Sequence, residues 1–478
     1  MMRQLFRLAV GGMDRQTSPR AMIAALLSAL SREGQTPQLF LGKSLPGQSS
    51  CGELACGEPD LGRVIASRAT RHIDSWTMSR CKASQLVSDG CLDASFALVH
   101  GNFGPHSLGP NVQPGAEPNS PLEYPLGSSL SELAKWLDLA KIAVVDASQP
   151  MRGHLPCSAT HVDGVLLDQL APADLTRWQV EVESLWGTKV IGYLPRTSAP
   201  RREFELAGRN CSLSKELCDQ LGNALLENLD LSRLLDVARR QNRPWQFEEV
   251  DRFATSRPLR VAIAWDEDFT GYFPDTIDRL EAAGAKLSDF SPRRCERIPE
   301  DCDLVYIGGA RPQAPWQRIA SNHCLMQSLR AHAMRGGRVY AEAEGAGLLC
   351  RELVLDSGVS LPMAGLLPIR ASQPKLIDGL PRPSQPTTVQ ATQSSWLLGE
   401  AHDFSTSTLR AYEAKAWHLD IDRATELLAT SADGEPLIIG SGNVVASQVW
   451  LHFAAMPELL ARLIAGKSLV SDWAPQLR

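Results

Sequence analysis

Short apolar runs rich in β-branched residues recur along the first half of the chain, with helical stretches between them. This pattern is typical of a mainly parallel sheet covered by helices. It predicts five strands, at Leu5–Val10, Ser95–Val99, Ile142–Asp146, Gly164–Leu167 and Val190–Tyr193.

The segment after the first predicted strand has helical periodicity. Its apolar residues Ala21, Ala25, Leu26, Ala29 and Leu30 recur at three- and four-residue spacing. We therefore expect a helix over Pro19–Arg32, with Thr17 or Ser18 as the cap and Pro19 in the first turn. The chain would then open with a strand, a loop and a helix.

The segment from Lys215 to Gln241 has a purely helical pattern of leucines, and a polar, proline-containing stretch follows it. Such a change of composition predicts a domain boundary. We expect a first domain at 1–240, a linker at 241–258 and a second domain at 259–478.

A second series of apolar runs begins after this linker. It predicts strands at Arg260–Trp265, Leu304–Ile307, Val339–Glu342 and Val444–Phe453. The segment Pro374–Thr392 is rich in Pro, Gln, Ser and Thr, which favours a long loop or an irregular β excursion. The pattern predicts two α/β domains in tandem.

Composition and charge narrow the function classes. The 478 residues carry 48 Lys plus Arg and 54 Asp plus Glu, for a net charge of −6, so we expect no nucleic-acid partner. No stretch reaches the ~20 apolar residues that a membrane span needs, and the apolar run near the start is too short for a secretory signal. The sequence favours a cytoplasmic protein.

The cysteines give no sign of a disulfide framework or a metal site. There are 11 of them, and none forms a Cys-x-x-Cys pair. We expect reduced, mostly structural thiols and no zinc.

Several segments in order resemble one family of enzymes. In the second domain they are VAIAWDEDFTGYFPDTIDRLEAAGAKLSDFSP, DLVYIGGARPQ, SLRAHAMRGGRVYAEAEGAGLL, LPMAGLLP and VVASQVWLHFAA, and in the first domain HIDSWTM, GSSLSELAKWLDLAKIAVVDAS, GVLLDQL and VIGYLPR. This text resembles cobyrinate a,c-diamide synthases, which amidate side-chain carboxylates of a corrinoid ring. The resemblance implies a P-loop-like, dethiobiotin-synthetase-like sheet domain, followed by a flavodoxin-like class I glutamine amidotransferase domain.

The resemblance also implies a catalytic cysteine, and this chain departs from it there. The family's Ala-Glu-Cys-Gly-Gly is here Ala341 to Gly345, so Ala343 stands at the nucleophile position and Glu344 follows it. A thiolate is needed to attack the glutamine amide. Cys350 is the nearest thiol along the chain, about two helical turns or roughly 10 Å away at 1.5 Å per residue. We expect no catalytic residue here.

Two further segments of the amidotransferase half are altered. In the family, the segment Gly-Gly-Gly-Tyr-Pro-Glu forms the strand that stabilises the oxyanion. The corresponding residues of this chain are Gly308, Gly309, Ala310, Arg311, Pro312 and Gln313. Where the family alternates a Tyr and two His, this chain has Gln448, Trp450 and His452, and a second His is retained at His402. The glycines favour a preserved backbone turn.

The phosphate loop departs from the family in the same way. Gly11 and Gly12 remain, but Ser18 stands where the phosphate-binding Lys belongs and Pro19 where a Mg²⁺-binding Thr belongs. His100 replaces a metal-associated Glu. The sequence predicts a degenerate nucleotide site with no resident cofactor.

These losses favour a pseudoenzyme that retains the fold for binding. The resemblance places a tetrapyrrole in a cleft, and the candidate contacts are Asp74, Trp76, Arg196, Arg201 and Arg202. Arginine suits an anionic, carboxylate-bearing ring.

Three functions remain open. The first is a silent carrier, sensor or scaffold that binds an anionic modified tetrapyrrole. The second is a regulatory subunit of an active, paralogous amidotransferase. The third is a working a,c-diamide synthase, with ATP, Mg²⁺ and glutamine or ammonia as nitrogen donor. The resemblance favours a homodimer.

Overall fold

A computed structural model of the protein describes residues 5–13, 19–42, 60–103, 130–148, 161–196, 199–209, 213–240, 258–311, 313–374, 384–399, 409–414, 416–421 and 425–465. The chain divides into two compact units, the first made of residues 1–44 and 58–248 and the second of residues 45–57 and 249–478. The finer bounds, with a linker at 241–258, stay a prediction.

Seven parallel strands form the sheet of the first unit, in the order β3-β2-β4-β1-β5-β6-β7. Their bounds are β1 (Phe6–Gly12), β2 (Pro37–Gly42), β3 (Arg71–Ile73), β4 (Phe96–Asn102), β5 (Ala140–Asp146), β6 (Gly164–Leu170) and β7 (Val190–Pro195). All five strands that the apolar runs predict are confirmed. The pattern missed β2 and β3.

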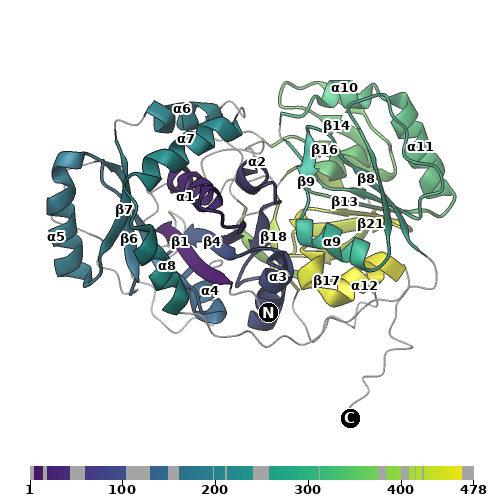
Figure 1. The fold of residues 1–478 in the computed structure, drawn as a ribbon. Coiled ribbons are helices and arrows are strands. Elements are labelled where there is room, and N and C mark those ends of the chain that lie inside the picture. Colours follow the sequence, from purple (N-terminus) through teal and green to yellow (C-terminus); the bar gives the residue numbers. More distant parts are fainter. Residues whose placement is uncertain are drawn as a thin grey trace, which may run out of the picture. The chain divides into compact units, whose positions relative to one another are not determined.

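Eight α-helices and one 3₁₀ turn are described in this unit. They are α1 (Arg20–Arg32), α2 (Leu61–Ala66), α3 (Arg80–Gly90), α4 (Leu130–Leu137), η1 (Pro172–Asp174), α5 (Leu175–Trp186), α6 (Ala199–Arg209), α7 (Lys215–Leu226) and α8 (Leu231–Arg240). One face of the sheet shares a hydrophobic core with α1, α2, α7 and α8. Figure 1 shows α6 and α7 lying over α1.

Helix α1 is buried almost throughout, because α7 covers its outer side. Gly222 of α7 permits this approach, since a Cβ there would lie 2.6 Å from Ser28 Oγ. Ser28 Oγ donates a hydrogen bond of 2.8 Å to Asp219 Oδ1. Pro19 is the N-cap rather than a first-turn residue, and the expected caps Thr17 and Ser18 lie outside the described residues.

The helical signal of Lys215–Gln241 comes from two helices with a break between them. After α7 ends at Leu226, Asp230 Oδ1 accepts a 3.0 Å hydrogen bond from Arg233 N at the start of α8. The break follows from this new capping side chain, because Asp favours helix starts over helix interiors.

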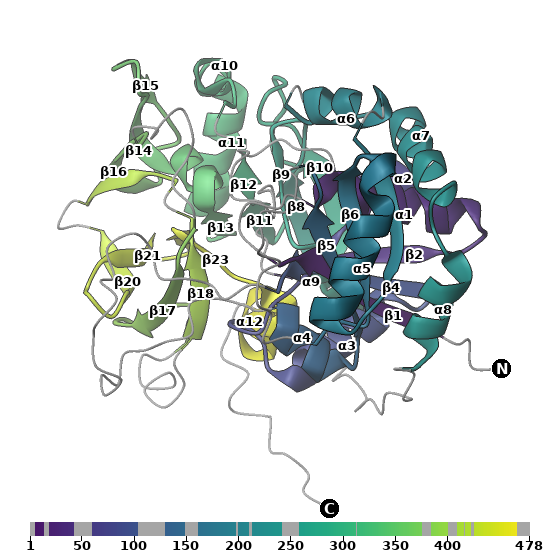
Figure 2. The ribbon, with the colours of Figure 1, turned by 90° about the vertical axis from the view of Figure 1, so that its left-hand side faces the viewer.

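The second unit has a ten-stranded mixed sheet, ordered β10-β8-β11-β13-β22-β21-β20-β17-β18-β23. The first five strands are parallel and the rest pair antiparallel. Their bounds are β8 (Arg260–Ala264), β10 (Lys286–Phe290), β11 (Leu304–Ile307), β13 (Arg338–Glu342), β17 (Pro386–Ala391), β18 (Leu409–Glu413), β20 (Glu426–Thr430), β21 (Pro436–Ser441), β22 (Val444–Ser447) and β23 (Val449–Trp450). Figure 2 shows the antiparallel strands β17, β18, β20 and β21 grouped together.

Two small sheets and several helices complete this unit. The strands are β9 (Phe269–Gly271), β12 (Gly309–Ala310), β14 (Cys350–Val354), β15 (Ser360–Pro362), β16 (Leu367–Ser372) and β19 (His418–Ile421). The helices are α9 (Pro274–Ala282), α10 (Trp316–Ala320), α11 (His323–Met334), η2 (Ala343–Leu348), η4 (Phe453–Ala455) and α12 (Pro457–Ala465). The α/β fold class is confirmed.

The prediction of one strand over Val444–Phe453 is wrong. The chain breaks at Gln448, because Ser447 Oγ bonds both the N–H and the carbonyl of Val449 at 3.2 and 2.7 Å. As a result β22 pairs with β13, and β23 pairs with β18. In the segment Pro374–Thr392, β17 is a regular strand, and residues 375–383 lie outside the described part.

Within the part of the chain that the structure describes, no helix has both the length and the apolar composition to cross a bilayer.

Candidate functional site

A sharp turn at the carboxyl end of β13 begins with Ala343. Ala343 has φ of 52°, a left-handed conformation that costs a non-glycine residue roughly 1–2 kcal/mol. Strained turns between a strand and a helix are where nucleophiles are presented in hydrolases. Here the turn carries a fully buried methyl group instead. A strained turn and a buried methyl group thus lie at the position where the resemblance implies a cysteine.

The turn packs tightly against the glycine-rich strand β12. A Cβ on Gly345 would lie 2.3 Å from Gly308 O, so glycine is required at this position. Gly308 N donates a hydrogen bond of 2.9 Å to Tyr272 Oη. The predicted preservation of the Gly308–Gly309 turn agrees with this packing.

Glu344 places a carboxyl group beside the backbone donors of this turn. The backbone N–H groups of Glu344 and Ala310 interact with the carboxyl group and lower its pKa, but burial outweighs them and raises the pKa to about 7. The Oε2 atom is buried, although the residue as a whole is partly exposed. Trp417 Nε1 donates to Glu344 O at 3.1 Å and holds the backbone. A carboxyl group thus lies where backbone donors would receive an oxyanion.

Trp450 and His452 both contact the ring of Phe273, and Trp450 also lies against the glycine-rich strand β12. The Trp450 indole covers Gly309 so closely that a Cβ on that glycine would lie 2.2 Å from the ring. His452 Nε2 is 3.9 Å from Asp275 Oδ2, and its ring lies 4.3 Å from that of Phe273. The site therefore holds a His–Asp pair and a bulky indole that occupies one of the family's alternating positions.

Cys350 has no property of a relocated nucleophile. Its Sγ donates a hydrogen bond of 2.8 Å to Gly347 O, and the residue is fully buried. Burial raises the pKa of this thiol to about 12, so it is protonated at neutral pH.

Two charged features of this site were not predicted from the sequence. Arg311 Nη2 lies 3.1 Å from Asp268 Oδ1 and anchors the altered loop, whereas Pro312 lies outside the described residues. Glu342 is fully buried and accepts hydrogen bonds of 2.8 and 2.9 Å from Tyr306 Oη and Tyr340 Oη. Burial raises the pKa of Glu342 to about 7. The sequence could have indicated the buried Glu342, because a glutamate ends the otherwise apolar run of this strand.

The first unit places the candidate phosphate-loop residues at the ends of β1 and β4. Gly11 lies against Gly101, where a Cβ would be 2.4 Å from the Gly101 carbonyl oxygen, and Gly12 pairs with Asn102. Ser18 lies outside the described residues, and Pro19 precedes α1.

His100, which the resemblance places at a metal-associated position, has a neutral ring. Its pKa is lowered to about 4, chiefly by burial; a 3.1 Å contact from Nδ1 to Val10 O opposes this shift, and the charge of Arg20 adds to it. A neutral imidazole tied to a backbone carbonyl does not replace a carboxylate ligand for Mg²⁺. Among the described residues, no group of three or more His, Cys, Asp or Glu side chains could hold a metal ion.

The candidate tetrapyrrole contacts are not brought together by the sheet of this unit. Asp74 and Trp76 follow β3, whereas Arg196 and the two other arginines follow β7, and these strands are opposite edges of a seven-stranded sheet. At ~4.8 Å per strand the edges are about 29 Å apart. The five residues therefore do not form one site within this unit.

Several of these residues have structural partners. Asp74 Oδ1 accepts hydrogen bonds of 2.5 and 2.8 Å from the N–H groups of Trp76 and Thr77.

Buried Arg201 forms a bidentate pair with Asp168, at 3.0 and 2.8 Å. By contrast, Arg202 is exposed, and Arg196 Nη1 donates to Ser148 O at 3.0 Å.

The comparisons with known proteins agree with the resemblance. Residues 260–455 match the CobB/CobQ-like glutamine amidotransferase domain. A protein named cobyrinate a,c-diamide synthase from Syntrophotalea carbinolica is 25% identical, covering 76% of this chain and 77% of its own. Its namesake from Dehalococcoides mccartyi strain 195 is 26% identical, covering 96% and 97%. The one from Salmonella typhimurium is 26% identical, covering 84% and 87%.

Proposed function

Because the chain belongs to the cobyrinate a,c-diamide synthase family, we propose that it binds an anionic modified tetrapyrrole without hydrolysing glutamine. It would act as a carrier, sensor or scaffold. The family indicates the class of ligand. The amidotransferase domain gives the reason to expect no glutamine hydrolysis.

The observation that carries this proposal is Ala343 at φ of 52° in the turn after β13. Acyl transfer from glutamine needs a nucleophile on this turn, since the amide carbon must be attacked before ammonia can leave. A methyl group offers no lone pair. Cys350, the nearest thiol in the sequence, is buried, protonated and hydrogen-bonded to a carbonyl.

The surroundings of Ala343 support the same conclusion. The carboxyl group of Glu344 lies beside the backbone N–H groups that would stabilise an oxyanion, and a negative charge there opposes a second one. The indole of Trp450 covers Gly309 on the adjacent strand. Restoring the thiol alone would therefore leave two obstacles.

Arg196 and Arg202 are the arginines that support an anionic ligand best. They are at the β7 edge of the first unit, and Arg202 is exposed. Exposed guanidinium groups can form bidentate contacts with the carboxylates of a tetrapyrrole. Arg201 is less suited, because its Nε and Nη2 already donate to Asp168 and its Nη1 donates to Glu205.

A binding assay tests this proposal. The full-length protein is titrated with cobyrinic acid and with sirohaem, and the visible absorption of the ring is followed. A saturable shift that weakens in Arg196→Ala and Arg202→Ala, and is retained in Arg177→Ala, supports the proposal. The absence of a shift at saturating ring concentrations contradicts it.

A second candidate function is a working a,c-diamide synthase that uses free ammonia. Relatives with that name match up to 96% of the chain, and this similarity supports the second candidate more directly than the first. The nucleotide site argues against it at one position, where neutral His100 replaces a carboxylate. ADP formation that depends on both cobyrinic acid and ammonium chloride, together with the mass of the amidated ring, distinguishes it from binding alone. The regulatory subunit and the homodimer stay predictions.

A further inference from the structure

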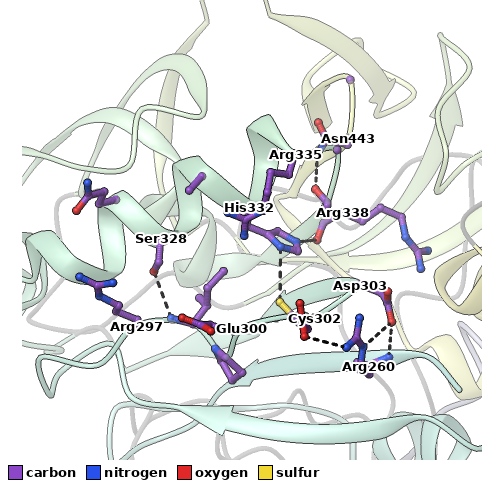
Figure 3. Close-up of a pocket in the computed structure, with 18 of the residues that line it drawn as sticks. Arg260, Arg297, Glu300, Cys302, Asp303, Ser328, His332, Arg335, Arg338 and Asn443 are labelled. Atoms are coloured by element: carbon purple, nitrogen blue, oxygen red, sulfur yellow. Dashed lines mark hydrogen bonds and ion pairs between the residues drawn. The ribbon is translucent and has the colours of Figure 1, made fainter.

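A cavity of about 1020 Å³ lies in the second unit at the amino ends of β8, β11 and β13. It is at the opposite end of these strands from Ala343, so it is separate from the altered glutamine site. Its size is that of a site for a small organic molecule. The loop before β11 and one face of α11 form its walls (Figure 3).

Cys302 and His332 form a hydrogen-bonded pair in the wall of this cavity. Cys302 Sγ lies 3.6 Å from His332 Nδ1, and His332 Nε2 lies 3.1 Å from Arg338 O. A carbonyl oxygen only accepts, so Nε2 carries the proton and Nδ1 is left as an acceptor for the thiol S–H. Figure 3 shows the imidazole directed at the sulfur.

The backbone around His332 is held in place. Asn443 Nδ2 donates to Ala333 O at 3.0 Å and also to Gly337 O, on either side of the turn after α11. Thiol, imidazole and orienting carbonyl are therefore arranged as nucleophile, base and base-orienting group.

Both partners are neutral at neutral pH. Burial is the main cause that raises the pKa of the Cys302 thiol to about 11; a backbone hydrogen bond and the charges of Arg260 and Arg335 oppose it, whereas the charge of Asp303 adds to it. Burial also lowers the pKa of His332. A thiol in this state reacts only if a base removes its proton, and the neutral imidazole is positioned to do so.

The free charges at the cavity favour an anion. Arg260 is paired with Asp301 and Asp303 at 3.6 and 3.5 Å, and Arg338 donates to the carbonyls that end α12. In the described part of the chain, the guanidinium groups of Arg297 and Arg335 have no ion-pair or hydrogen-bond partner. Glu300 at the same cavity is also without an ion-pair partner among these residues, so one positive charge is in excess.

We propose that Cys302 is a modification site that exchanges with a small anionic disulfide, with His332 as base and Arg297 and Arg335 as the groups that receive its carboxylates. The Cys302 sulfur attacks one sulfur of the disulfide while its proton passes to His332 Nδ1. A new S–S bond forms and the old one breaks. The leaving thiolate takes the proton from His332 and departs as a thiol, so no other oxidant is needed.

The test compares two disulfide probes of opposite charge on the full-length protein. Glutathione disulfide is anionic and cystamine is cationic. Peptide mapping by mass spectrometry gives the modification rate at each thiol, with exposed Cys81 of the first unit as internal control. We expect the ratio of glutathione to cystamine rates to be at least tenfold higher at Cys302 than at Cys81.

Variants separate the two roles. Arg335→Ala should lower this ratio at Cys302 several-fold, whereas Arg318→Ala, at an exposed arginine outside the cavity, should leave it unchanged. His332→Asn should slow modification of Cys302 by both probes about tenfold and leave Cys81 unaffected.

Equal charge ratios at the two thiols of the wild-type protein would overturn the proposal, and this result needs no variant to fold. A Cys302 rate that does not change in a folded His332→Asn protein would also overturn it.

Discussion

The carboxyl group of Glu344 provides a direct test of how the altered turn is built. Burial raises its pKa to about 7, against 4.5 for an ordinary glutamate. The unfolded chain loses this proton near pH 4.5, whereas the folded protein keeps it to about pH 7. Between these values the folded state binds more protons, so its stability falls as the pH rises.

The magnitude follows from the size of the shift. One pKa unit corresponds to about 1.4 kcal/mol of unfolding free energy. From pH 5.5 to the folded pKa of about 7 is about 1.5 units, so the wild type loses about 2 kcal/mol of stability over this range. Glu344→Gln removes the ionisation and keeps an oxygen acceptor for the two backbone N–H groups. The variant should therefore gain about 2 kcal/mol relative to the wild type between pH 5.5 and pH 8. For a domain of this size that is roughly 4–8 °C in Tm.

Thermal unfolding followed by circular dichroism at pH 5.5 and pH 8 measures this difference. Glu426→Gln, at an exposed glutamate of the same unit, is the matched control and should shift Tm equally at both values. Glu342 has a raised pKa in both the wild type and the Glu344→Gln variant, so its contribution to the pH dependence of stability largely cancels between them. If Glu344→Gln changes Tm by the same amount at both pH values, the carboxyl group is solvated and the reasoning is refuted.

Four other experiments test the remaining features. Ala343→Cys should release no glutamate from glutamine, because Glu344 and Trp450 still obstruct the site; measurable release in a coupled glutamate assay would contradict this. His100 has a folded pKa of about 4 against 6.5, so the unfolded state binds more protons and stability should fall as the pH drops from 6.5 to 4. Urea unfolding should show a smaller fall in His100→Asn, and an identical fall would count against a neutral buried ring. Arg201→Ala should cost about 3–5 kcal/mol in urea unfolding, since it leaves Asp168 buried without its partner, whereas Arg202→Ala should cost less than about 0.5. Native Cys350 should resist iodoacetamide while exposed Cys295 reacts, as mass spectrometry would show; equal rates would mean that Cys350 is accessible.

The elements that sequence reasoning located best are buried strands with continuous apolar runs. Leu304–Ile307 is β11 to the residue, because all four side chains are buried between covering layers. β2 was missed because Pro37 opens it and the apolar run is short, although the strand lies inside the sheet. Local pattern does not report such tertiary neighbours.

The candidate sites show the same division. The sequence alone shows that alanine stands at position 343, where the resembled family has a cysteine, because this depends on one residue in a recognisable segment. The environment of Glu344 depends on Ala310, which is far away in the chain. Arg201 looked available for a ligand, but Asp168, on a different element, neutralises it. Charge partners of this kind come from the fold and cannot be assigned from residue type alone.

Glutamate formation from glutamine by the purified full-length protein tests the central claim most directly. The assay contains Mg·ATP and cobyrinic acid, and its rate is compared with a blank without protein. Our account predicts no glutamate above the blank at any protein concentration. A rate that rises in proportion to the protein and disappears with a glutamine-site inhibitor would contradict it.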